Sequence, residues 1–251
     1  QNKIIGIAKN FTRAPTTRDY PVFFSKPWSS LVLPGQPVRV KPNTLINYEF
    51  ELGVMIGKEC SRINLSRSNY LDYIGGYFLC LDLTEATGIP LKTQKGGTWT
   101  LCKGMDSLTP VGNFIERSAI TDPNNVVLEL IQNGNRAQLG NTRDFTYKID
   151  EQIEILSYHT KLYPGDLLLT GTFDNMKPIN KGDVLKGSLY ITGSDPRSQL
   201  KKQKGVVYEN DKLCLDLKNP GSEGLDGLKS DYTFNCEVLE ETKRFLHFAS
   251  Q

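Results

Sequence analysis

Two glutamates lie two residues apart in an apolar segment, and an aspartate follows about thirty residues later in a second one. Glu49 and Glu51 lie in the segment 47–57, and Asp82 lies in the segment 75–84. Side chains alternate along a strand, so both glutamates are expected on one face. Acids among apolar residues are costly unless a cation or a proton compensates them. The three oxygen ligands therefore predict a magnesium or manganese site.

Short β-branched and aromatic segments predict the strands that must position these acids. The expected strands cover 3–8, 22–25, 48–56, 76–83, 126–132, 166–170, 184–191 and 233–239. Helical periodicity is weaker, and it is clearest over 149–160, where Ile149, Ile153 and Leu156 lie along one side. The sequence therefore predicts an α+β, β-rich fold with a few short helices.

The overall composition is that of a folded globular protein. The 251 residues include 30 Lys and Arg against 28 Asp and Glu, so net charge favours neither a nucleic acid nor a membrane surface as partner. No segment approaches the roughly twenty apolar residues that span a bilayer, so no membrane span is expected. The cysteines are odd in number and widely spaced, which indicates reduced, buried residues: Cys60, Cys80, Cys102, Cys214 and Cys236.

A polar, turn-rich segment separates the last two predicted strands. Residues 192–229 contain Gly193-Ser194-Asp195-Pro196 and the charged run 201–204, and they are interpreted as an insertion that offers a contact surface. The runs 206–208 and 213–215 inside it predict that part of it is ordered against this chain or another. The expected organisation is one domain over 1–191 and 230–240, with a C-terminal tail over 241–251.

Beyond the acids, five ordered motifs resemble the fumarylacetoacetate hydrolase family. They are 49–53 (EFELG), 72–77 (DYIGGY), 81–84 (LDLT), 99–104 (WTLCKG) and 164–172 (PGDLLLTGT). The resemblance extends from about residue 4 to 191, resumes at the last strand, and is closest to the small members of the family. It implies a mixed β-sandwich roll, a homodimer, and an activity among acylpyruvate hydrolysis, oxaloacetate decarboxylation and oxaloacetate keto–enol tautomerisation. Several such members are mitochondrial, and a chain that starts at Gln1 suits an imported protein or an incompletely described end.

The same resemblance implies roles for five residues. Glu49, Glu51 and Asp82 match the family's ligands for magnesium or manganese, which would chelate a 2-oxo acid and stabilise its enolate as a Lewis acid. Lys103 matches the active-site lysine, which would place a positive charge beside the developing oxyanion. Thr172 matches a residue that hydrogen-bonds the substrate carboxylate.

Several family positions differ in this chain. The histidine and glutamate that activate water are absent from the matching stretch 10–17, where Pro15 should also disturb the short helix that displays them. Ala86 and Ile89 stand where an arginine and a glutamine hold substrate. Phe173 replaces a proline and is expected to fill part of the pocket, and Glu85 would repel a dicarboxylate if it faced inward.

Two hypotheses follow from the motifs that match the family and from the family residues that this chain lacks. The first is a metal-dependent enzyme of 2-oxo acids, a tautomerase or decarboxylase that manages without hydrolytic water. The second is a pseudoenzyme that retains the fold and uses its insertion as a contact surface in a larger assembly. For both hypotheses a location on the matrix side of the mitochondrion is favoured over a cytoplasmic one.

Overall fold

The computed structural model is built mainly of β-strands. It describes residues 2–11, 20–87, 99–191 and 232–240, together with the backbone of strands 206–209 and 212–215. A six-stranded sheet has, in spatial order, β10 (Ile115–Glu116), β7 (Ile74–Leu81), β6 (Phe50–Ile56), β13 (Leu167–Leu169), β1 (Ile4–Ala8) and β2 (Val22–Lys26). Its β1–β13 pair is parallel and its other pairs are antiparallel, so the sheet is mixed.

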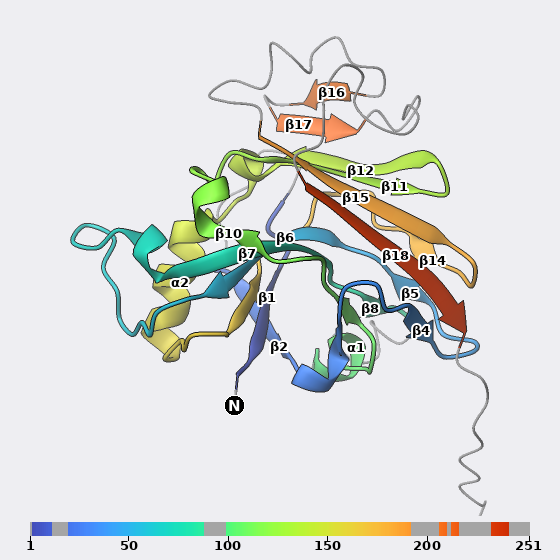
Figure 1. Ribbon diagram of the computed structural model, residues 1–251, viewed down its shortest axis with the longest axis horizontal. Helices are drawn as coiled ribbons and strands as arrows, with labels where there is room; N and C mark the ends of the chain where they lie inside the picture. The colour runs from blue at the N-terminus through green and yellow to red at the C-terminus, as the bar shows by residue number, and fades with distance from the viewer. Residues whose placement is uncertain are drawn as a thin grey trace, which may run out of the picture.

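A five-stranded sheet lies against the first one (Figure 1). Its order is β12 (Asn135–Asn141), β11 (Val127–Gln132), β15 (Val184–Tyr190), β18 (Tyr232–Glu240) and β4 (Val38–Val40). The main hydrophobic core fills the space between the two sheets, where the ring centroid of Phe50 in β6 lies 6.1 Å from that of Phe234 in β18. Burying both inner faces in this way is the dominant stabilising contribution to the fold.

Smaller elements complete the described part of the chain. The short strands are β3 (Leu31–Val32), β5 (Ile46–Asn47), β8 (Thr84–Glu85), β9 (Thr109–Pro110), β14 (Pro178–Ile179), β16 (Val206–Glu209) and β17 (Lys212–Leu215). The helices are α1 (Thr100–Lys103), α2 (Ile149–His159) and the 3-10 turns η1 (Trp28–Ser30), η2 (Tyr70–Tyr73), η4 (Arg117–Ala119) and η5 (Thr142–Asp144). None of the helices in this part of the chain has the length and hydropathy needed to cross a membrane.

These elements confirm the predicted β-rich α+β fold. Each of the eight expected strand regions contains a strand, shifted by no more than two residues at its ends, and α2 occupies the predicted helix. The sequence reading did not predict β12, whose residues are largely polar. This strand forms because Asn133 and Gly134, with φ of 51° and 79°, turn the chain back so that β12 pairs with β11.

The segment between β15 and β18 joins two neighbouring strands of the five-stranded sheet. Within the predicted insertion, β16 and β17 pair as an antiparallel hairpin, and the backbone of β17 lies beside β12 of the same chain (Figure 1). The rest of 192–229 and the tail 241–251 lie outside the described residues, so the predicted division of the chain stays a prediction.

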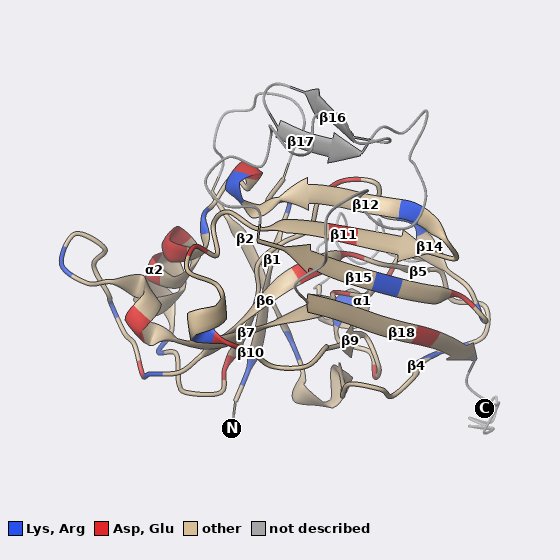
Figure 2. Cartoon of the chain, turned by 45° about the horizontal axis from the view of Figure 1, so that its top comes forward, with Lys and Arg blue, Asp and Glu red and all other residues tan. Residues whose placement is uncertain are grey.

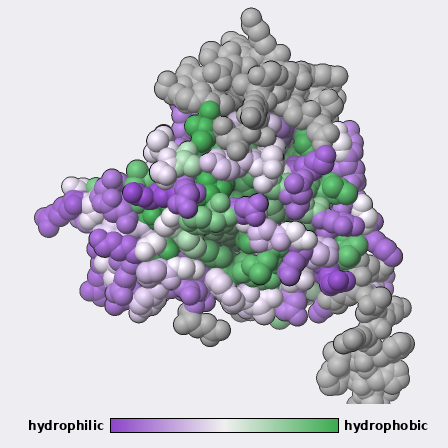
Figure 3. Space-filling model, in the orientation of Figure 1, coloured by the Kyte–Doolittle hydropathy of each residue, from purple (hydrophilic) through white to green (hydrophobic). Residues whose placement is uncertain are grey.

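Charged and apolar side chains have different distributions on the outer surface. Figure 2 shows basic and acidic residues interspersed over the described elements. Hydrophobic residues gather near the middle of the face shown in Figure 3. A hollow of about 240 Å³ lies between the β7–β10 region and β18, lined by Leu79, Asn113, Phe114, Ile115, Tyr232 and Thr233.

Candidate metal and substrate site

The pairing of β6 with β7 brings the three predicted acids together. Phe50 pairs with Leu81 in this antiparallel pair, so Glu49, which precedes Phe50, lies opposite Asp82, which follows Leu81. The Asp82 N–H donates to the Glu49 carbonyl at 2.8 Å. Glu51 lies two residues on from Glu49 and projects on the same face. One carboxylate oxygen from each of the three residues lies within 4.8 Å of the others, so the structure brings together the acids that the sequence indicated.

The three carboxylates are largely withdrawn from water. Asp82 is fully buried, Glu51 is 1% exposed, and the side chain of Glu49 is 17% exposed. Three negative charges in this environment repel one another strongly, because the low local dielectric screens them little. The cluster therefore needs positive charge close by.

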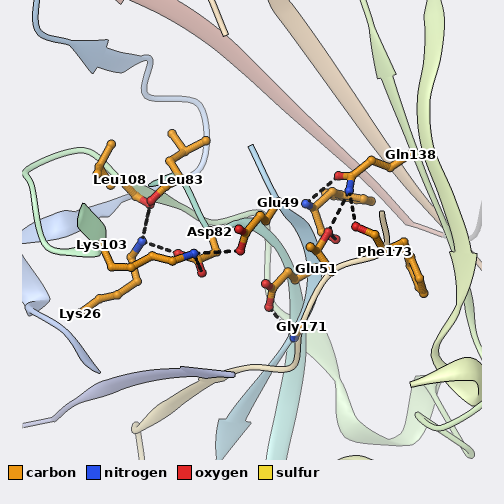
Figure 4. A network of polar contacts seen from close by, with 12 residues as sticks. Lys26, Glu49, Glu51, Asp82, Leu83, Lys103, Leu108, Gln138, Gly171 and Phe173 are labelled. Atoms are coloured by element: carbon orange, nitrogen blue, oxygen red, sulfur yellow. Dashed lines mark hydrogen bonds and ion pairs between the residues drawn. The ribbon is translucent and has the colours of Figure 1, made fainter. Parts of the chain in front are cut away.

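Lys103 supplies part of that charge. It ends α1, is 1% exposed, and its Nζ donates to Glu49 Oε2 at 2.8 Å and to Asp82 Oδ2 at 2.5 Å. The same ammonium lies 4.7 Å from the ring centroid of Phe24, which covers its remaining side. The structure thus places the predicted lysine directly at the carboxylates (Figure 4).

A second lysine, Lys26, belongs to the cluster and was missed by sequence reasoning. It ends β2 and is buried, and its Nζ donates to Asp82 Oδ1 at 2.5 Å, to the Leu83 carbonyl at 3.1 Å and to the Leu108 carbonyl at 2.9 Å. All three ammonium protons have acceptors, and Lys26 fixes Asp82 through the carboxylate oxygen that Lys103 does not contact. Its only sequence signal is a lone lysine directly after the predicted strand 22–25.

The two lysines make the pKa values of the buried acids differ. Burial opposes ionisation of Asp82, yet the ammonium groups of Lys103 and Lys26 outweigh it and lower the pKa of Asp82. Burial likewise opposes the charge on Lys103, but Asp82 and Glu49 raise its pKa. For Glu51, burial and the negative charges of Asp82 and Glu49 together raise the pKa well above its usual range. Glu51 would therefore gain most from an added cation.

The donor set fits a hard divalent cation. The cluster offers carboxylate oxygens from three side chains, with no described cysteine or histidine among them. Together with the two lysines it carries a formal charge of −1, which leaves negative charge for a cation to neutralise. Oxygen donors of this kind are those that magnesium and manganese prefer.

The loop after β13 lies beside the carboxylates. The Gly171 N–H donates to Glu51 Oε2 at 2.7 Å, and Gly171 adopts a φ of 103°, which a residue with a Cβ rarely adopts. The next residue is Thr172, whose hydroxyl donates to the Phe50 carbonyl at 3.0 Å. The structure thus brings the predicted substrate-binding threonine next to β6, which contains Glu51 and directly follows Glu49.

The ring of Phe173 does not fill space above the carboxylates, contrary to the expectation from sequence. It is 1% exposed, lies with its centroid 5.1 Å from the Phe145 ring and 5.3 Å from the Phe11 ring, and points away from the acids (Figure 4). Its close neighbour is Gly140 of β12, where a Cβ would lie 2.2 Å from the ring. Apolar burial explains this placement, because the core offers Phe173 a fully dehydrated position.

Other positions at which the chain departs from the family pattern lie only partly within the structure. Glu85 is buried in β8, and its carboxylate accepts the Thr87 N–H at 2.9 Å. Ala86 is half-buried directly after it. Ile89 and the stretch 12–17 lie outside the described residues.

Comparison with known proteins shows the family to which the chain belongs. The family model "Fumarylacetoacetate (FAA) hydrolase C-terminal" matches residues 4–202. The mitochondrial oxaloacetate decarboxylase of Dictyostelium discoideum is 34% identical over 204 residues, 78% of this chain and 92% of that protein. The mitochondrial oxaloacetate tautomerase of Schizosaccharomyces pombe is 37% identical over 171 residues, 67% of this chain and 77% of that protein.

Solved structures show the same fold. A fumarylacetoacetate hydrolase family protein of yeast superposes with a TM-score of 0.74 at 21% identity, covering 97% of this chain and 95% of that one. The sheets, the carboxylate cluster and the matched sequence define a fumarylacetoacetate hydrolase fold with a candidate metal site. The chain belongs to the fumarylacetoacetate hydrolase family.

Proposed function

We propose that this protein is a metal-dependent enzyme that acts on 2-oxo acids by way of an enolate. The observation that carries the proposal is the set of three carboxylates within 4.8 Å of one another, with the Lys103 ammonium bonded to two of them. Magnesium or manganese held by Glu49, Glu51 and Asp82 would act there as a Lewis acid on the 2-oxo group.

The chain's own residues have defined tasks in this proposal. Lys103, held by Asp82 and Glu49, presents a fixed positive charge where negative charge develops on the enolate oxygen. The Thr172 hydroxyl binds the substrate carboxylate. The Gly171 N–H keeps Glu51 oriented by donating to one of its oxygens.

Among the family's reactions, decarboxylation and keto–enol tautomerisation suit this chain best. Hydrolysis requires a base that activates water, and the stretch 10–17 contains neither a histidine nor a glutamate. Decarboxylation and tautomerisation consume no nucleophilic water. Both need a stabilised enolate and a bound carboxylate, which the named residues supply, and exchange of a carbon-bound proton with solvent. The named relatives include an oxaloacetate decarboxylase and an oxaloacetate tautomerase, both mitochondrial, and we extend both reaction classes and the matrix location to this protein as proposals.

The test is turnover of oxaloacetate and acylpyruvates by the purified protein with magnesium or manganese, followed by enol and keto absorbance. Glu51→Ala should abolish turnover and weaken Mn²⁺ binding measured by electron paramagnetic resonance. Glu116→Ala, which removes an exposed carboxylate on β10, should change neither. Equal turnover in the protein and in Glu51→Ala would contradict the proposal.

A second candidate is a pseudoenzyme that serves as a structural subunit, either as a homodimer or in a larger assembly. It is favoured by the ion pairs of Lys26 and Lys103, which already balance two of the three buried negative charges without a cation. The hollow beside Phe114, which has both polar and apolar side chains in its lining, is a candidate contact surface. Co-purifying partners that are lost when 193–228 is shortened, with folding intact, would support this reading, provided that no substrate is turned over.

A further inference from the structure

Gln138 is a buried amide whose hydrogen bonds all run to the candidate site. It lies in β12 and is 1% exposed. Its Oε1 accepts the Phe50 N–H at 3.0 Å, and its Nε2 donates to Thr172 Oγ1 at 3.0 Å, the Phe173 carbonyl at 2.9 Å and the Asp174 carbonyl at 3.1 Å. Burying an unpaired amide is costly, and here both ends of the amide have partners.

These partners lie on the two segments that form the site. Phe50 stands between Glu49 and Glu51 in β6, and Thr172 follows Gly171, which itself bonds Glu51. Gln138 therefore links the start of β6, where the two glutamates flank Phe50, to the loop that contains Thr172 (Figure 4). The loop's other end is held separately, because the Thr170 hydroxyl donates to the Leu52 carbonyl at 2.7 Å.

The direction of these bonds determines what the Thr172 hydroxyl can do. A hydroxyl carries one proton and can both donate and accept. The Gln138 amide donates to Thr172 Oγ1, and the hydroxyl proton points to the Phe50 carbonyl at 3.0 Å. A substrate carboxylate, which only accepts, can replace the Phe50 carbonyl as partner without disturbing the bond from Gln138.

We propose that Gln138 is a positioning residue that holds Thr172 in place as a hydrogen-bond donor to the carboxylate of the substrate. The proposal rests on the proposed function of the site. It assigns Gln138 to substrate binding rather than to the chemical step, since its bonds reach Thr172 and the backbone of Phe50 but none of the three acids.

A purely structural role makes a different prediction. A side chain that only anchors the loop would, when replaced, lower stability and reduce all functions of the site together, including cation binding. A residue that acts through Thr172 would raise KM with little change in kcat, and its effect would disappear once the threonine hydroxyl is gone.

The experiment compares Gln138→Glu, Thr172→Val and the double variant. Gln138→Glu keeps an acceptor for the Phe50 N–H but removes the donor to Thr172 and to the carbonyls of Phe173 and Asp174. We expect KM for the 2-oxo acid to rise roughly tenfold or more, as for loss of a hydrogen bond to a charged group. We expect kcat and the Kd of Mn²⁺ to change by less than about threefold, a margin within the ordinary variation of single effects. The double variant should have the KM of Thr172→Val alone.

Binding of oxalate in the presence of Mg²⁺, measured by calorimetry, gives a readout that needs no turnover. Oxalate affinity should fall in Gln138→Glu in parallel with the rise in KM. Gln138→Met, which keeps the side-chain length without a charge, serves if Gln138→Glu does not fold, and thermal unfolding checks both variants.

The outcomes separate this inference from the proposed function. Normal KM and oxalate affinity in a folded Gln138→Glu, or additive effects in the double variant, would overturn the positioning role while the site's function stands. A wild-type protein that neither turns over 2-oxo acids nor binds oxalate would overturn the proposed function, and the inference with it.

Discussion

The ammonium group of Lys103 lies 2.5 Å from Oδ2 of Asp82, so the lysine occupies space beside an oxygen that is a candidate cation ligand. Lys103 therefore has two opposing effects. It stabilises the buried acids when no cation is bound, and it competes electrostatically with a cation that approaches them. The balance between these effects can be measured by removing the charge.

Lys103→Gln should bind Mn²⁺ more tightly and turn substrate over more slowly. The repulsion between ammonium and cation is lost, while the positive charge beside the enolate oxygen is lost as well. Removing one stabilising group at an oxyanion typically lowers kcat about 10²- to 10³-fold. A Mn²⁺ titration by electron paramagnetic resonance and an oxaloacetate assay measure the two effects. Lys58→Gln, at an exposed position, is the control, and weaker Mn²⁺ binding in Lys103→Gln would contradict the competition.

Lys26→Met should destabilise the fold even when no ligand is present. The methionine fills similar space but leaves Asp82 Oδ1 and the carbonyls of Leu83 and Leu108 without their donor. Breaking a buried ion pair by removing one partner costs about 3–5 kcal/mol in the free energy of unfolding. Urea denaturation measures the loss, and Lys26→Arg, which keeps the charge, should lose less. An unchanged midpoint in Lys26→Met would show that these contacts contribute little.

The hydrogen bonds of Asp166 predict how the free energy of unfolding changes at acid pH. Burial opposes its ionisation, but the hydrogen bonds from the Lys3 side chain and from the backbone N–H groups of Tyr163 and Lys3 outweigh it and lower the pKa of Asp166. A lowered folded pKa means that the stabilisation is complete above the unfolded value of about 3.9 and is lost as pH falls through the folded value.

Asp166→Asn should therefore be less stable than the wild type at pH 7, by roughly 1.5–3 kcal/mol for loss of charged hydrogen bonds. The difference should shrink below about pH 4 as the wild-type carboxylate becomes protonated. Thermal unfolding at a series of pH values tests this. A difference that stays constant between neutral and acid pH would exclude the Asp166 charge as its source.

Gly140→Ala should destabilise the loop that carries Thr172. A Cβ at Gly140 would lie 2.2 Å from the Phe173 ring, so the ring must move. Overpacking of this kind costs about 1–3 kcal/mol. Chemical denaturation of Gly140→Ala and of the double variant with Phe173→Leu measures it, since the smaller side chain should recover part of the loss. If Gly140→Ala and the double variant lose the same free energy of unfolding, the strain does not arise from contact with the Phe173 ring.

Sequence alone determined the features that depend on local spacing. The x-Glu-x-Glu pattern on a strand requires Glu49 and Glu51 to share a face, because side chains alternate with a period of two. The apolar segments predicted β6, β7, β13 and β15 for the same kind of reason, and the 3.6-residue period predicted α2. The apolar segment around Asp82 also indicated the third acid, and the motif matches added Lys103 and Thr172. In the structure Lys103 contacts Asp82, and Thr172 bonds the carbonyl of Phe50, between the two glutamates.

Tertiary structure decided which residues surround these acids. Lys26 is 56 residues from Asp82, and Gln138 is 88 residues from Phe50, so no local pattern links either pair. Their partners are set by how β2 and β12 are placed against β6 and β7, which depends on burial of the whole core. The same burial turned Phe173 toward Phe145 rather than toward the carboxylates. Long-range hydrogen bonds and ring packing form only when the sheets come together, so the composition of a single segment cannot predict them.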